Sequence, residues 1–342
     1  MSRRGPWHDG PRPWVVAEVG VNHEGDAALA RRLVDAAAEA GADAVKFQTF
    51  DPELLVSPAA STAPYQADRT AVTTQRQLLA GYTFDRDTWH ELAARARNHG
   101  LVVASTAFDR PSLALVEELD PGFHKVPSGE VTNLGLLRAV AACGRPVLVS
   151  TGMADEAEVA AALDALDAAP EVVLLHCVTA YPVEPEHLNL ASIPYLRERF
   201  GREVGFSDHS IGSVGGIAAV VLGAVVVERH LTLDRSLPGP DHEASLTPAE
   251  FAEYVLRLRA AAAALGTPGI RRLDVEAPNV AAARRSWHAT RTLAAGTRLR
   301  ADDVVALRPE RGISTGVDVI GRTLARSVVE GEPLVAEDLE AP

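Results

Sequence analysis

Eight short apolar runs, each followed by a segment with the pattern of an amphipathic helix, constrain the fold of this chain more than any other feature. Such alternation predicts a parallel sheet, because parallel strands need a crossover that a helix normally provides. Helical segments such as residues 26–41 and 247–266 carry apolar residues at helical spacing and end at glycine. The predicted strands are residues 14–20, 44–50, 101–108, 123–128, 146–151, 171–178, 203–209 and 225–233.

The number of these units selects one architecture. Eight strands close a (β/α)₈ barrel, and the units span about 260 residues, the usual size of that fold. An open doubly wound sheet is the alternative, but no G-x-G-x-x-G fingerprint follows the first predicted strand. The sequence therefore predicts a (β/α)₈ TIM barrel over residues 1–264.

The pattern changes after the barrel. Residues 265–285 are a predicted linker, and residues 286–342 hold short β-rich pieces with turn signals such as AAGT and VEGE. A piece of about 55 residues lies near the lower size limit for independent folding. We expect a small C-terminal β-rich domain that leans on the barrel or on a partner subunit.

Composition excludes some classes of partner. A net charge of -13 disfavours the basic face that nucleic acids require. No run of about 18 or more apolar residues offers a membrane span, and no apolar signal-peptide core follows the first arginines. The two cysteines, Cys143 and Cys177, form neither a CxxC motif nor a zinc-binding spacing. We therefore expect a reduced, cytoplasmic setting, without nucleic acid or membrane as a partner.

Lysine is nearly absent from the chain. Of 33 basic residues, only Lys46 and Lys125 are lysines. Because arginine is a wide planar fork and lysine a compact point charge, a tight anionic site would demand lysine at these positions. Chance survival of two lysines is the alternative, so their location decides. Both lie near the C-terminal ends of predicted strands, where (β/α)₈ enzymes carry their active sites.

Polar residues end nearly every predicted strand. Lysines and hydroxyl groups around one barrel mouth suit a phosphate or a phosphorylated carboxylate. A single strand-end Ser or Thr is also a common helix cap, and a lone His is more often structural. The polar residues at these ends are Glu18, Lys46, Gln48, Ser105, Thr106, Lys125, Ser128, Glu130, Ser150, Thr151, His176, Thr179, Tyr181, Ser207, His209, Glu228 and His230.

Two histidines end adjacent predicted strands. His209 and His230 can converge on one cation, since neutral imidazole binds Mn, Fe, Zn or Co. Two histidines alone leave the open coordination positions that a catalytic metal needs, whereas a purely structural pair is the alternative. Cys177 is expected to be buried core without an activating partner, and His124 and His187 to be surface or packing residues.

Longer motifs connect these residues to a known family. The motifs AEVGVNHEGD, GADAVKFQTF, KVPSGEVTN, VLVSTGM, LLHCVTAYP, GFSDHSIG and ERHLTLDRSLPGPDHEASL follow one another between residues 17 and 246. They resemble the sialic acid synthase family, which includes N-acetylneuraminate, legionaminic and pseudaminic acid synthases. The C-terminal piece resembles the SAF (antifreeze-like) domain of these enzymes.

The resemblance implies an enzyme that condenses phosphoenolpyruvate with the open-chain aldehyde of a 2-acetamido sugar. The products are a nine-carbon 2-keto-3-deoxy (nonulosonic) acid and phosphate. Lys46 and Lys125 would hold the phosphoenolpyruvate carboxylate, and Tyr181 would close over its phosphate. His209 and His230 would bind a divalent cation, most often Mn²⁺ but also Mg²⁺ or Co²⁺, which polarises the aldehyde. The other implied phosphoenolpyruvate contacts are Thr106, Ser128, Ser150, Thr179 and Ser207.

Carboxylates and an amide complete the implied site. Glu18 is the candidate base for the attacking water, and the alternative is that Glu18 only orients Lys46. Glu228 would orient a metal ligand. Gln48, Glu130 and Asp241 would contact sugar hydroxyls.

The resemblance of the tail to the SAF domain implies a domain-swapped homodimer in which this domain covers the partner's barrel. An arginine of its RPG-type motif then reaches the sugar N-acetyl group, and RPERGIS places this role on Arg308. Glu310 and Arg311 depart from the usual motif before Gly312. Thr179 stands where related synthases carry Asn, which predicts altered substrate binding without loss of activity.

Two other functions stay open. One is a synthase or aldolase that uses the same barrel chemistry on a phosphorylated sugar. The other is a non-enzymatic carbohydrate-binding protein, although such a module has no use for a metal pair that faces an anion cluster. N-acetylmannosamine and 2,4-diacetamido-6-deoxyhexoses are the candidate sugars, and residues 51–82, with Tyr65 and Gln66, can discriminate among them.

Overall fold

The computed structural model of the chain describes residues 4–8, 12–58, 60 and 74–341. Contacts divide the chain into two compact units, Met1–Gly266 and Thr267–Pro342. Tyr65 and Gln66, the residues expected to discriminate among sugars, lie outside the described residues.

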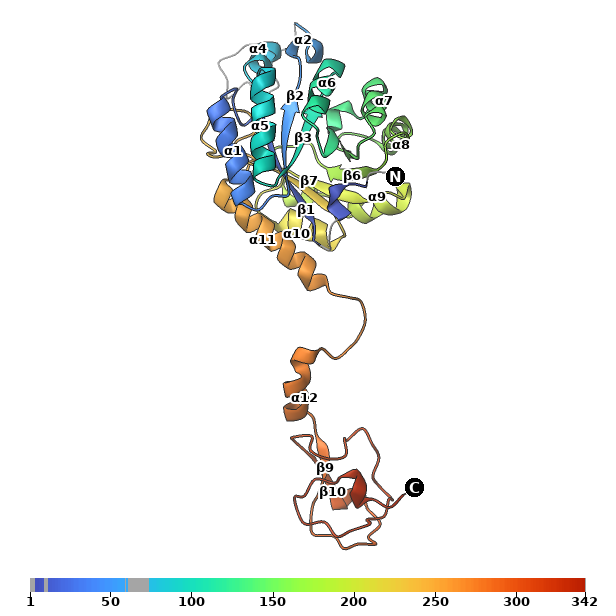
Figure 1. Cartoon of the computed structure of the whole chain (residues 1–342). Coiled ribbons are helices and arrows are strands. Elements are labelled where there is room, and N and C mark those ends of the chain that lie inside the picture. Colours follow the sequence, from blue (N-terminus) through green and yellow to red (C-terminus); the bar gives the residue numbers. More distant parts are fainter. Residues whose placement is uncertain (1–3, 9–11, 59, 61–73, 342) are drawn as a thin grey trace. The chain divides into compact units, whose positions relative to one another are not determined.

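The strands of the first unit form a closed parallel barrel (Figure 1). They pair in sequence order, and β1 also pairs with β8, so the sheet has no edge. The predicted TIM barrel is therefore confirmed, and the open doubly wound sheet is excluded. Each strand lies within the range predicted for it. The strands are β1 (Trp14–Gly20), β2 (Ala44–Thr49), β3 (Val102–Ala107), β4 (Phe123–Val126), β5 (Val147–Ser150), β6 (Val172–Cys177), β7 (Val204–Asp208) and β8 (Val226–His230).

Helices surround these strands, and several begin at an aspartate. The side chains of Asp26, Asp85, Asp109 and Asp155 accept hydrogen bonds from N–H groups of the first helical turn. These caps fix the residue at which each helix begins, because they accept hydrogen bonds from N–H groups that have no partner within the helix. The helices are α1 (Ala27–Glu39), α2 (Pro52–Leu55), α4 (Gln75–Ala80), α5 (Arg86–Asn98), α6 (Arg110–Glu118), α7 (Leu134–Ala142), α8 (Glu156–Ala165), α9 (Ser192–Phe200), α10 (Val214–Val221) and α11 (Pro248–Leu265), with short 3₁₀ helices η1 (Pro6–His8), η2 (Ser128–Glu130) and η3 (Pro185–His187).

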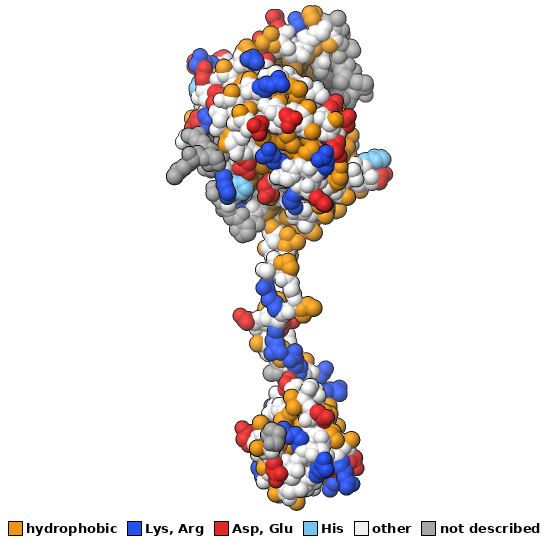
Figure 2. Space-filling view, turned by 90° about the vertical axis from the view of Figure 1, so that its right-hand side faces the viewer, with side chains coloured by type: hydrophobic (Ala, Val, Ile, Leu, Met, Phe, Trp, Pro, Cys, Tyr) orange, Lys and Arg blue, Asp and Glu red, His pale blue; other side chains and the backbone are white. Residues whose placement is uncertain are grey.

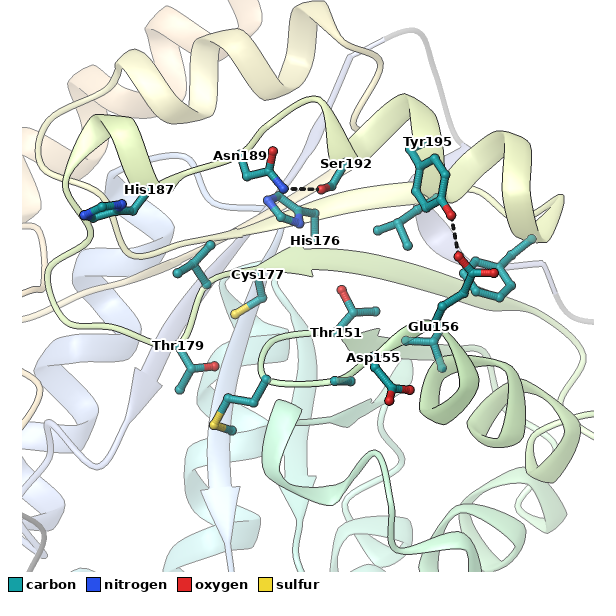
Figure 3. Close-up of a pocket in the computed structure, with 16 residues that line it drawn as sticks. Thr151, Asp155, Glu156, His176, Cys177, Thr179, His187, Asn189, Ser192 and Tyr195 are labelled. Atoms are coloured by element: carbon teal, nitrogen blue, oxygen red, sulfur yellow. Dashed lines mark hydrogen bonds between the residues drawn. The ribbon is translucent and has the colours of Figure 1, made fainter.

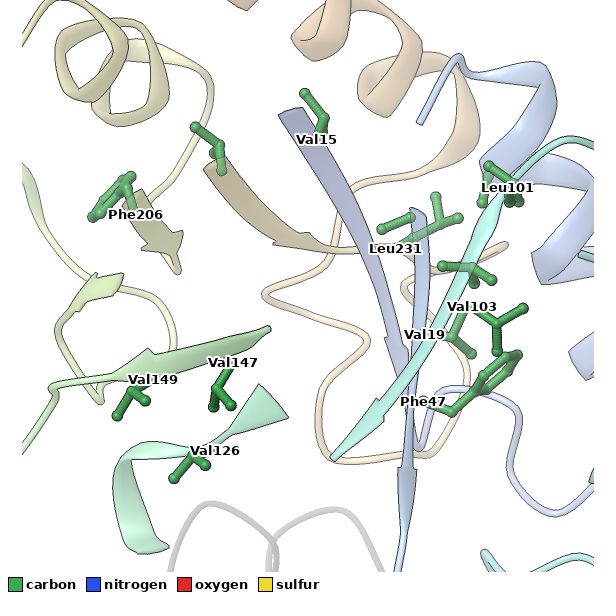
Figure 4. Close-up of a cluster of buried hydrophobic side chains, with 14 of the residues drawn as sticks. Val15, Val19, Phe47, Leu101, Val103, Val126, Val147, Val149, Phe206 and Leu231 are labelled. Atoms are coloured by element: carbon green, nitrogen blue, oxygen red, sulfur yellow. The ribbon is translucent and has the colours of Figure 1, made fainter. Parts of the chain in front are cut away.

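The main hydrophobic core lies between the barrel and its helices. Figure 4 shows part of it, with Val15, Phe47, Val147 and Phe206 projecting from different strands. All of these side chains are buried. This layer holds the helices against the barrel through the hydrophobic effect.

A second apolar cluster fills the barrel interior where the strands begin. It includes Trp14 and Val16 on β1, Phe123 on β4 and Leu148 on β5. Trp7 of η1 packs edge-on against Phe123, with 5.9 Å between the ring centroids. We call this cluster the lower half of the barrel interior.

The second unit is small and β-rich, as predicted. Strands β9 (Ser286–Ala289) and β10 (Val304–Leu307) form an antiparallel pair. The helix α12 (Ala277–Ala283) and the 3₁₀ helix η4 (Asp274–Glu276) precede this pair, and η5 (Ala301–Asp303) and η6 (Ala336–Asp338) follow β9. The core of the unit consists of Ala289, Leu293, Leu299, Val304, Val319, Leu324, Val328, Leu334 and Leu339.

Charge is unevenly distributed over the surface. Acidic and basic side chains mix on the visible face of the first unit (Figure 2). Exposed arginines gather in the segment before β9, at Arg271, Arg272, Arg284 and Arg285. None of the described helices combines the length and the apolar composition that crossing a bilayer requires.

Candidate active site

The inward faces of the strands change from apolar to polar toward their C-terminal ends. On β1, Trp14 and Val16 are followed by Glu18, and on β2, Ala44 is followed by Lys46. Side chains two residues apart share one face of a strand, so the polar groups meet above the apolar cluster. We call these polar residues, all of them buried, the mouth: Glu18, Lys46, Thr106, Lys125, Ser150, Ser207, His209, Glu228 and His230.

Glu228 lies between the two lysines. Its Oε1 is 3.4 Å from Lys125 Nζ, and its Oε2 is 3.8 Å from Lys46 Nζ. Lys46 Nζ also lies 2.6 Å from Glu18 Oε2 and donates a hydrogen bond to Thr106 Oγ1 at 3.1 Å. The only two lysines of the chain therefore share one buried carboxylate.

The two glutamates of this network differ in proton affinity. Burial raises the pKa of Glu18 to about 7, although Lys46 acts in the opposite direction. Burial also disfavours the anion of Glu228, but Lys125 and Lys46 outweigh it and lower the pKa of Glu228 to about 2. Carboxyl groups whose surroundings separate their pKa values in this way are typical of acid–base sites. Glu228 is thus an anion, whereas Glu18 can gain or lose a proton near neutral pH.

The lysines differ as well. Burial lowers the pKa of Lys125, even though Glu228 opposes this change. Burial would do the same to Lys46, but Glu18 and Glu228 outweigh it, and the pKa of Lys46 is raised. Lys46 is therefore the more firmly charged of the two ammonium groups.

Hydroxyl groups from separate loops meet around Gly152. Its N–H donates a hydrogen bond to Ser128 Oγ at 3.0 Å. A Cβ at Gly152 would lie 2.4 Å from Thr179 Oγ1 and 2.7 Å from Ser128 Oγ, so only glycine fits there. Ser150 Oγ is buried and has no hydrogen-bond partner among the described residues. Buried polar groups are normally paired, so an unpartnered hydroxyl beside a hydroxyl-lined backbone indicates a site for an oxygen-rich ligand.

His209 and His230 lie together at the mouth, with 5.7 Å between their ring centroids. His209 Nδ1 is 2.9 Å from the carbonyl oxygen of Val178, which can only accept, so this hydrogen bond assigns the proton to Nδ1 and leaves the Nε2 lone pair available. His230 Nδ1 is buried without a hydrogen bond from the described residues, and Asp241 Oδ2 is 3.9 Å away. Burial lowers the pKa of His230 well below its usual range, which keeps the ring neutral. Two imidazoles beside a carboxylate fit a divalent cation.

Two residues from loops approach this histidine pair. The ring of Tyr181 lies 4.1 Å from that of His209 and 5.9 Å from that of His230, measured between centroids. Asp241 follows β8 in a long loop, and burial raises its pKa to about 6. The family resemblance implies a phosphate contact for Tyr181 and a sugar contact for Asp241. Both assignments stay predictions. The structure shows in addition that Tyr181 and Asp241 lie close to the two histidines.

The remaining predicted sugar contacts fall in three different places. Gln48 is partly buried beside the mouth, and its Nε2 donates to Glu18 Oε1 at 3.0 Å. Glu130 lies in η2, and its Oε2 accepts a hydrogen bond from Asn133 Nδ2 at 2.7 Å. Arg308 is exposed and belongs to the second unit. Their contacts with a sugar stay predictions.

The prediction that Cys177 has no activating partner is wrong. The thiol is buried as expected, but its Sγ lies 3.9 Å from His209 Nδ1. Burial would raise the pKa of Cys177, yet His209 and Lys125 outweigh it and lower that pKa. The contact with Cys177 likewise outweighs the effect of burial on His209 and raises its pKa. Strand alternation carried the signal, because Cys177 shares the inward face of β6 with Leu175.

Another group of potential metal ligands lies away from the mouth. Ligand atoms of Glu117, His124 and Cys143 lie within 4.8 Å of one another. Glu117 Oε1, however, already lies 2.9 Å from His124 Nε2 and 2.8 Å from Arg145 Nε. Burial raises the pKa of Cys143, which favours the protonated thiol. An arginine and a protonated thiol disfavour a cation here, so the histidine pair is the better candidate.

One cavity lies beside β6, and neither lysine is among the residues that line it. It has a volume of about 530 Å³, and Figure 3 shows that strand β6 and the helical residues around Glu156 and Tyr195 line it. Its polar groups pair with one another: Tyr195 with Glu156, and Asn189 Nδ2 with Ser192 Oγ at 2.9 Å. His176 turns outward and lies 2.7 Å from the Leu188 carbonyl. Cys177 and Thr179 also line this cavity, so it borders the hydroxyl groups around Gly152.

Two family matches cover most of the chain. Residues 33–269 match the NeuB family, and residues 284–340 match the SAF domain. These ranges correspond to the barrel and to the small β-rich unit.

Individual relatives match over nearly their full length. The chain is 37% identical to the N,N'-diacetyllegionaminic acid synthase of Legionella pneumophila, over 96% of this chain and 95% of the relative. It is 38% identical to the enzyme of the same name from Campylobacter jejuni, over 88% and 91%. A crystal structure of N-acetylneuraminic acid synthetase from Leptospira borgpetersenii, in complex with citrate, superposes with a TM-score of 0.71 at 31% identity, over 79% of this chain and 91% of that one.

Proposed function

Because the chain belongs to the NeuB family, whose named relatives are acid synthases, we propose that it condenses phosphoenolpyruvate with the open-chain aldehyde of a 2-acetamido sugar. The products would be a nonulosonic acid and phosphate. The observation that carries this proposal is the pair of buried lysines that share Glu228 beside two histidines. Two legionaminic acid synthases among the relatives favour a 2,4-diacetamido-6-deoxyhexose as the sugar over N-acetylmannosamine.

The ammonium, hydroxyl and N–H groups at the mouth and around Gly152 support phosphoenolpyruvate as the ligand. Phosphoenolpyruvate carries a phosphate and a carboxylate, and Lys46 and Lys125 supply compact positive charges for them. The N–H of Gly152 and the hydroxyls of Ser128, Ser150 and Thr179 would bind phosphate oxygens. The phosphoenolpyruvate contacts proposed in full are Lys46, Thr106, Lys125, Ser128, Ser150, Thr179, Tyr181 and Ser207.

The excess of negative over positive groups supports a divalent cation at this site. The mouth and Asp241 together hold carboxyl groups from Glu18, Glu228 and Asp241, and the anionic substrate adds more negative charge. Two lysines alone do not neutralise this set. A cation held by His209 and His230, which we propose to be manganese, would act as a Lewis acid on the aldehyde.

The residues of the mouth would then guide one bond formation and one bond cleavage. C3 of phosphoenolpyruvate bonds to the aldehyde carbon, whose oxygen takes up a proton, and C2 becomes electron-deficient. Water adds to C2 and loses a proton to Glu18, whose pKa of about 7 suits a base near neutral pH. The C2–O bond then breaks, phosphate leaves with the bonding electron pair, and the C2 hydroxyl loses its proton as the 2-keto group forms. This proton balances the one that the aldehyde oxygen takes up from solvent. Lys46, which lies 2.6 Å from Glu18, would hold this carboxylate in place and balance its charge.

The sugar end of the site and the assembly remain proposals of the family resemblance. Gln48, Glu130, Asp241 and Arg308 would contact the sugar. The SAF domain would exchange between the protomers of a homodimer, and a reduced cytoplasmic setting would agree with the free thiols of Cys143 and Cys177.

A phosphate-release assay tests this function. The protein is incubated with Mn²⁺, phosphoenolpyruvate and a panel that contains N-acetylmannosamine, a 2,4-diacetamido-6-deoxyhexose and phosphorylated N-acetylmannosamine. We expect release with the diacetamido sugar, and loss of release when EDTA removes the metal. Release with only the phosphorylated sugar would favour the alternative function, a synthase or aldolase that acts on a phosphorylated sugar. No release with any sugar would contradict the proposal. Activity that survives EDTA would remove the metal from it.

A further inference from the structure

A buried ion pair lies directly behind the two histidines. Arg229 Nη1 is 3.0 Å from Asp208 Oδ1, and both side chains are almost completely inaccessible. The same nitrogen donates a hydrogen bond to the Asp208 carbonyl oxygen at 3.1 Å. Arg229 thus binds both the carboxylate and the backbone carbonyl of Asp208, the last residue of β7.

Further hydrogen bonds hold the carboxylate of Asp208. Tyr254 of α11 donates its hydroxyl to Asp208 Oδ2 at 2.6 Å, and the guanidinium of Arg229 lies over the Tyr254 ring at 5.7 Å. Ser210 donates both its N–H, at 2.9 Å, and its hydroxyl, at 2.6 Å, to Asp208 Oδ1. Each of these bonds fixes the chain immediately before or after His209.

Close packing leaves this cluster little room to rearrange. A Cβ at Gly216 of α10 would lie 2.1 Å from the Tyr254 hydroxyl oxygen. A Cβ at Gly215 would lie 2.7 Å from Ser210 Oγ and 3.4 Å from Asp208 Oδ1. Two glycines therefore allow α10 to approach the cluster, which holds its polar groups in a single arrangement.

Strand register connects this pair to the histidines. Asp208 on β7 stands opposite Arg229 on β8, and each is followed directly by one histidine of the pair. Since successive residues of a strand point to opposite sides, the ion pair faces the helices and the histidines face the mouth. Clamping Asp208 to Arg229 therefore fixes the relative position of His209 and His230.

Stability alone does not account for a pair of charges at this depth. Replacing a buried ion pair by apolar residues of similar volume is often neutral or stabilising, so the position of this pair next to both histidines, and not its charge alone, is the informative observation. The residues around a metal ligand that orient it typically change metal affinity by about 10-fold to 100-fold when they are replaced.

We propose that Asp208, Arg229 and Tyr254 are positioning residues that set the separation and orientation of His209 and His230, and thereby the affinity of the histidine pair for a divalent cation. This inference rests on the cation of the proposed function, but it does not depend on which sugar is condensed.

Manganese affinity of the purified full chain tests the proposal, measured from the electron paramagnetic resonance signal of free Mn²⁺. Tyr254→Phe removes a single hydroxyl, and Arg229→Lys keeps the charge but loses the fork that grips Asp208. We expect both variants to bind Mn²⁺ about 10-fold to 100-fold more weakly than the unsubstituted protein. Excess Mn²⁺ should restore their phosphate release, which a loss of folded protein would not allow.

A matched control lies at the opposite end of the barrel. Asp43, which is partly buried, also forms an ion pair: its Oδ1 lies 2.7 Å from Nη2 of the exposed Arg12, and its Oδ2 accepts a hydrogen bond from the Val15 N–H at 2.9 Å. Asp43→Asn should lower the thermal unfolding midpoint without changing Mn²⁺ affinity.

The outcomes separate this inference from the proposed function. Folded Tyr254→Phe and Arg229→Lys proteins that bind Mn²⁺ as tightly as the unsubstituted protein would overturn the positioning role. Failure of the unsubstituted protein to bind Mn²⁺ through His209 and His230 would remove the proposed cation, and this inference with it. Weakened binding in the variants, together with no phosphate release from any sugar, would support the inference and contradict only the proposed reaction.

Discussion

The two ends of the barrel interior are built by the same strands from opposite kinds of side chain. Where the strands begin, Phe123 and Leu148 belong to the apolar lower half. Two residues further along the same strands, Lys125 and Ser150 bring an ammonium group and a hydroxyl, and both are buried as well. The lower half gains stability from its burial, whereas buried charges and an unpartnered hydroxyl add little stability or reduce it. The lower half therefore stabilises the folded barrel, whereas the polar groups of the mouth are explained by ligand binding and not by stability.

The sharpest test of this division is the removal of a histidine at the mouth. His209→Ala should lower phosphate release by at least about 10³-fold, because Lewis-acid catalysis contributes several kilocalories per mole to the barrier. Its thermal unfolding midpoint should stay close to that of the unsubstituted protein. His176→Asn is the control, since His176 is buried on the outward side of β6, and this change should affect stability alone. A soluble His209→Ala protein with a near-normal rate would show that His209 is not a ligand.

The converse experiment breaks the lower half. Phe123 is completely buried, and Phe123→Ala should lower the free energy of unfolding by about 3–5 kcal/mol through lost burial and the resulting cavity. Turnover per folded molecule should be unchanged, as urea unfolding and phosphate release on the same sample will show. Lys125→Met, two residues along the same strand, should abolish turnover. If Phe123→Ala reduced turnover of the folded protein as well, the two halves would not be separable.

His23, a buried histidine that follows β1, tests how much the burial of a titratable group destabilises the folded protein at low pH. His23 is completely buried against Phe84, its Nδ1 accepts the Gly25 N–H at 3.1 Å, and burial lowers its pKa to about 4. The unfolded chain therefore binds a proton from about pH 6.5 downward, before the folded chain does. This difference leaves stability unaffected above pH 6.5 and costs up to about 3 kcal/mol as the pH falls to 4.

The measurement compares urea unfolding of the unsubstituted protein and His23→Asn at pH 7 and at lower pH. Asparagine keeps an acceptor for Gly25 but does not bind a proton, so the variant should lack this part of the acid destabilisation. The difference between the two proteins is the informative quantity, because Glu18, whose pKa is raised to about 7, contributes in the opposite direction in both. Equal acid sensitivity of the two proteins would contradict the burial effect.

The smallest expected effect concerns a single hydroxyl. Ser150→Ala removes a buried group that has no hydrogen-bond partner among the described residues, so stability should be unchanged or slightly higher. The KM for phosphoenolpyruvate should rise about tenfold or more, because a hydrogen bond to a charged ligand contributes about 1.5–3 kcal/mol. Ser105→Ala is the control: Ser105 lies 2.8 Å from Thr49 Oγ1 on the outward side of β3, so its loss should reduce stability and leave KM unchanged. An unchanged KM in Ser150→Ala would exclude Ser150 from the ligand site.

The barrel was predictable because its signals are local. Apolar alternation placed every strand, and the same alternation put Lys46 on the inward face with Glu18 and Thr106 on neighbouring strands. That Lys125 and Lys46 reach one carboxylate was not predictable, because it depends on the register by which the sheet closes. The prediction that Glu228 orients a metal ligand therefore left out its position between the two lysines.

Loop residues were harder to predict than strand residues. Asp241 approaches His230 from a long loop after β8, and no periodicity fixes such a path. The pair of Asp208 and Arg229 left a visible signal, namely a charged residue directly before each histidine at the end of a strand. Strand pairing was needed to turn that signal into a contact.

The burial of both lysines has a practical consequence for chemical labelling. Lys46 is 3% exposed and Lys125 is 4% exposed, and the chain has no other lysine. An amine-acylating reagent therefore finds no lysine on the folded surface, and lysine-directed cross-linkers cannot join two copies through their side chains. Acylation at either position instead reports access of the reagent to the interior of the barrel, so the rate of labelling offers a direct readout of how often that interior opens.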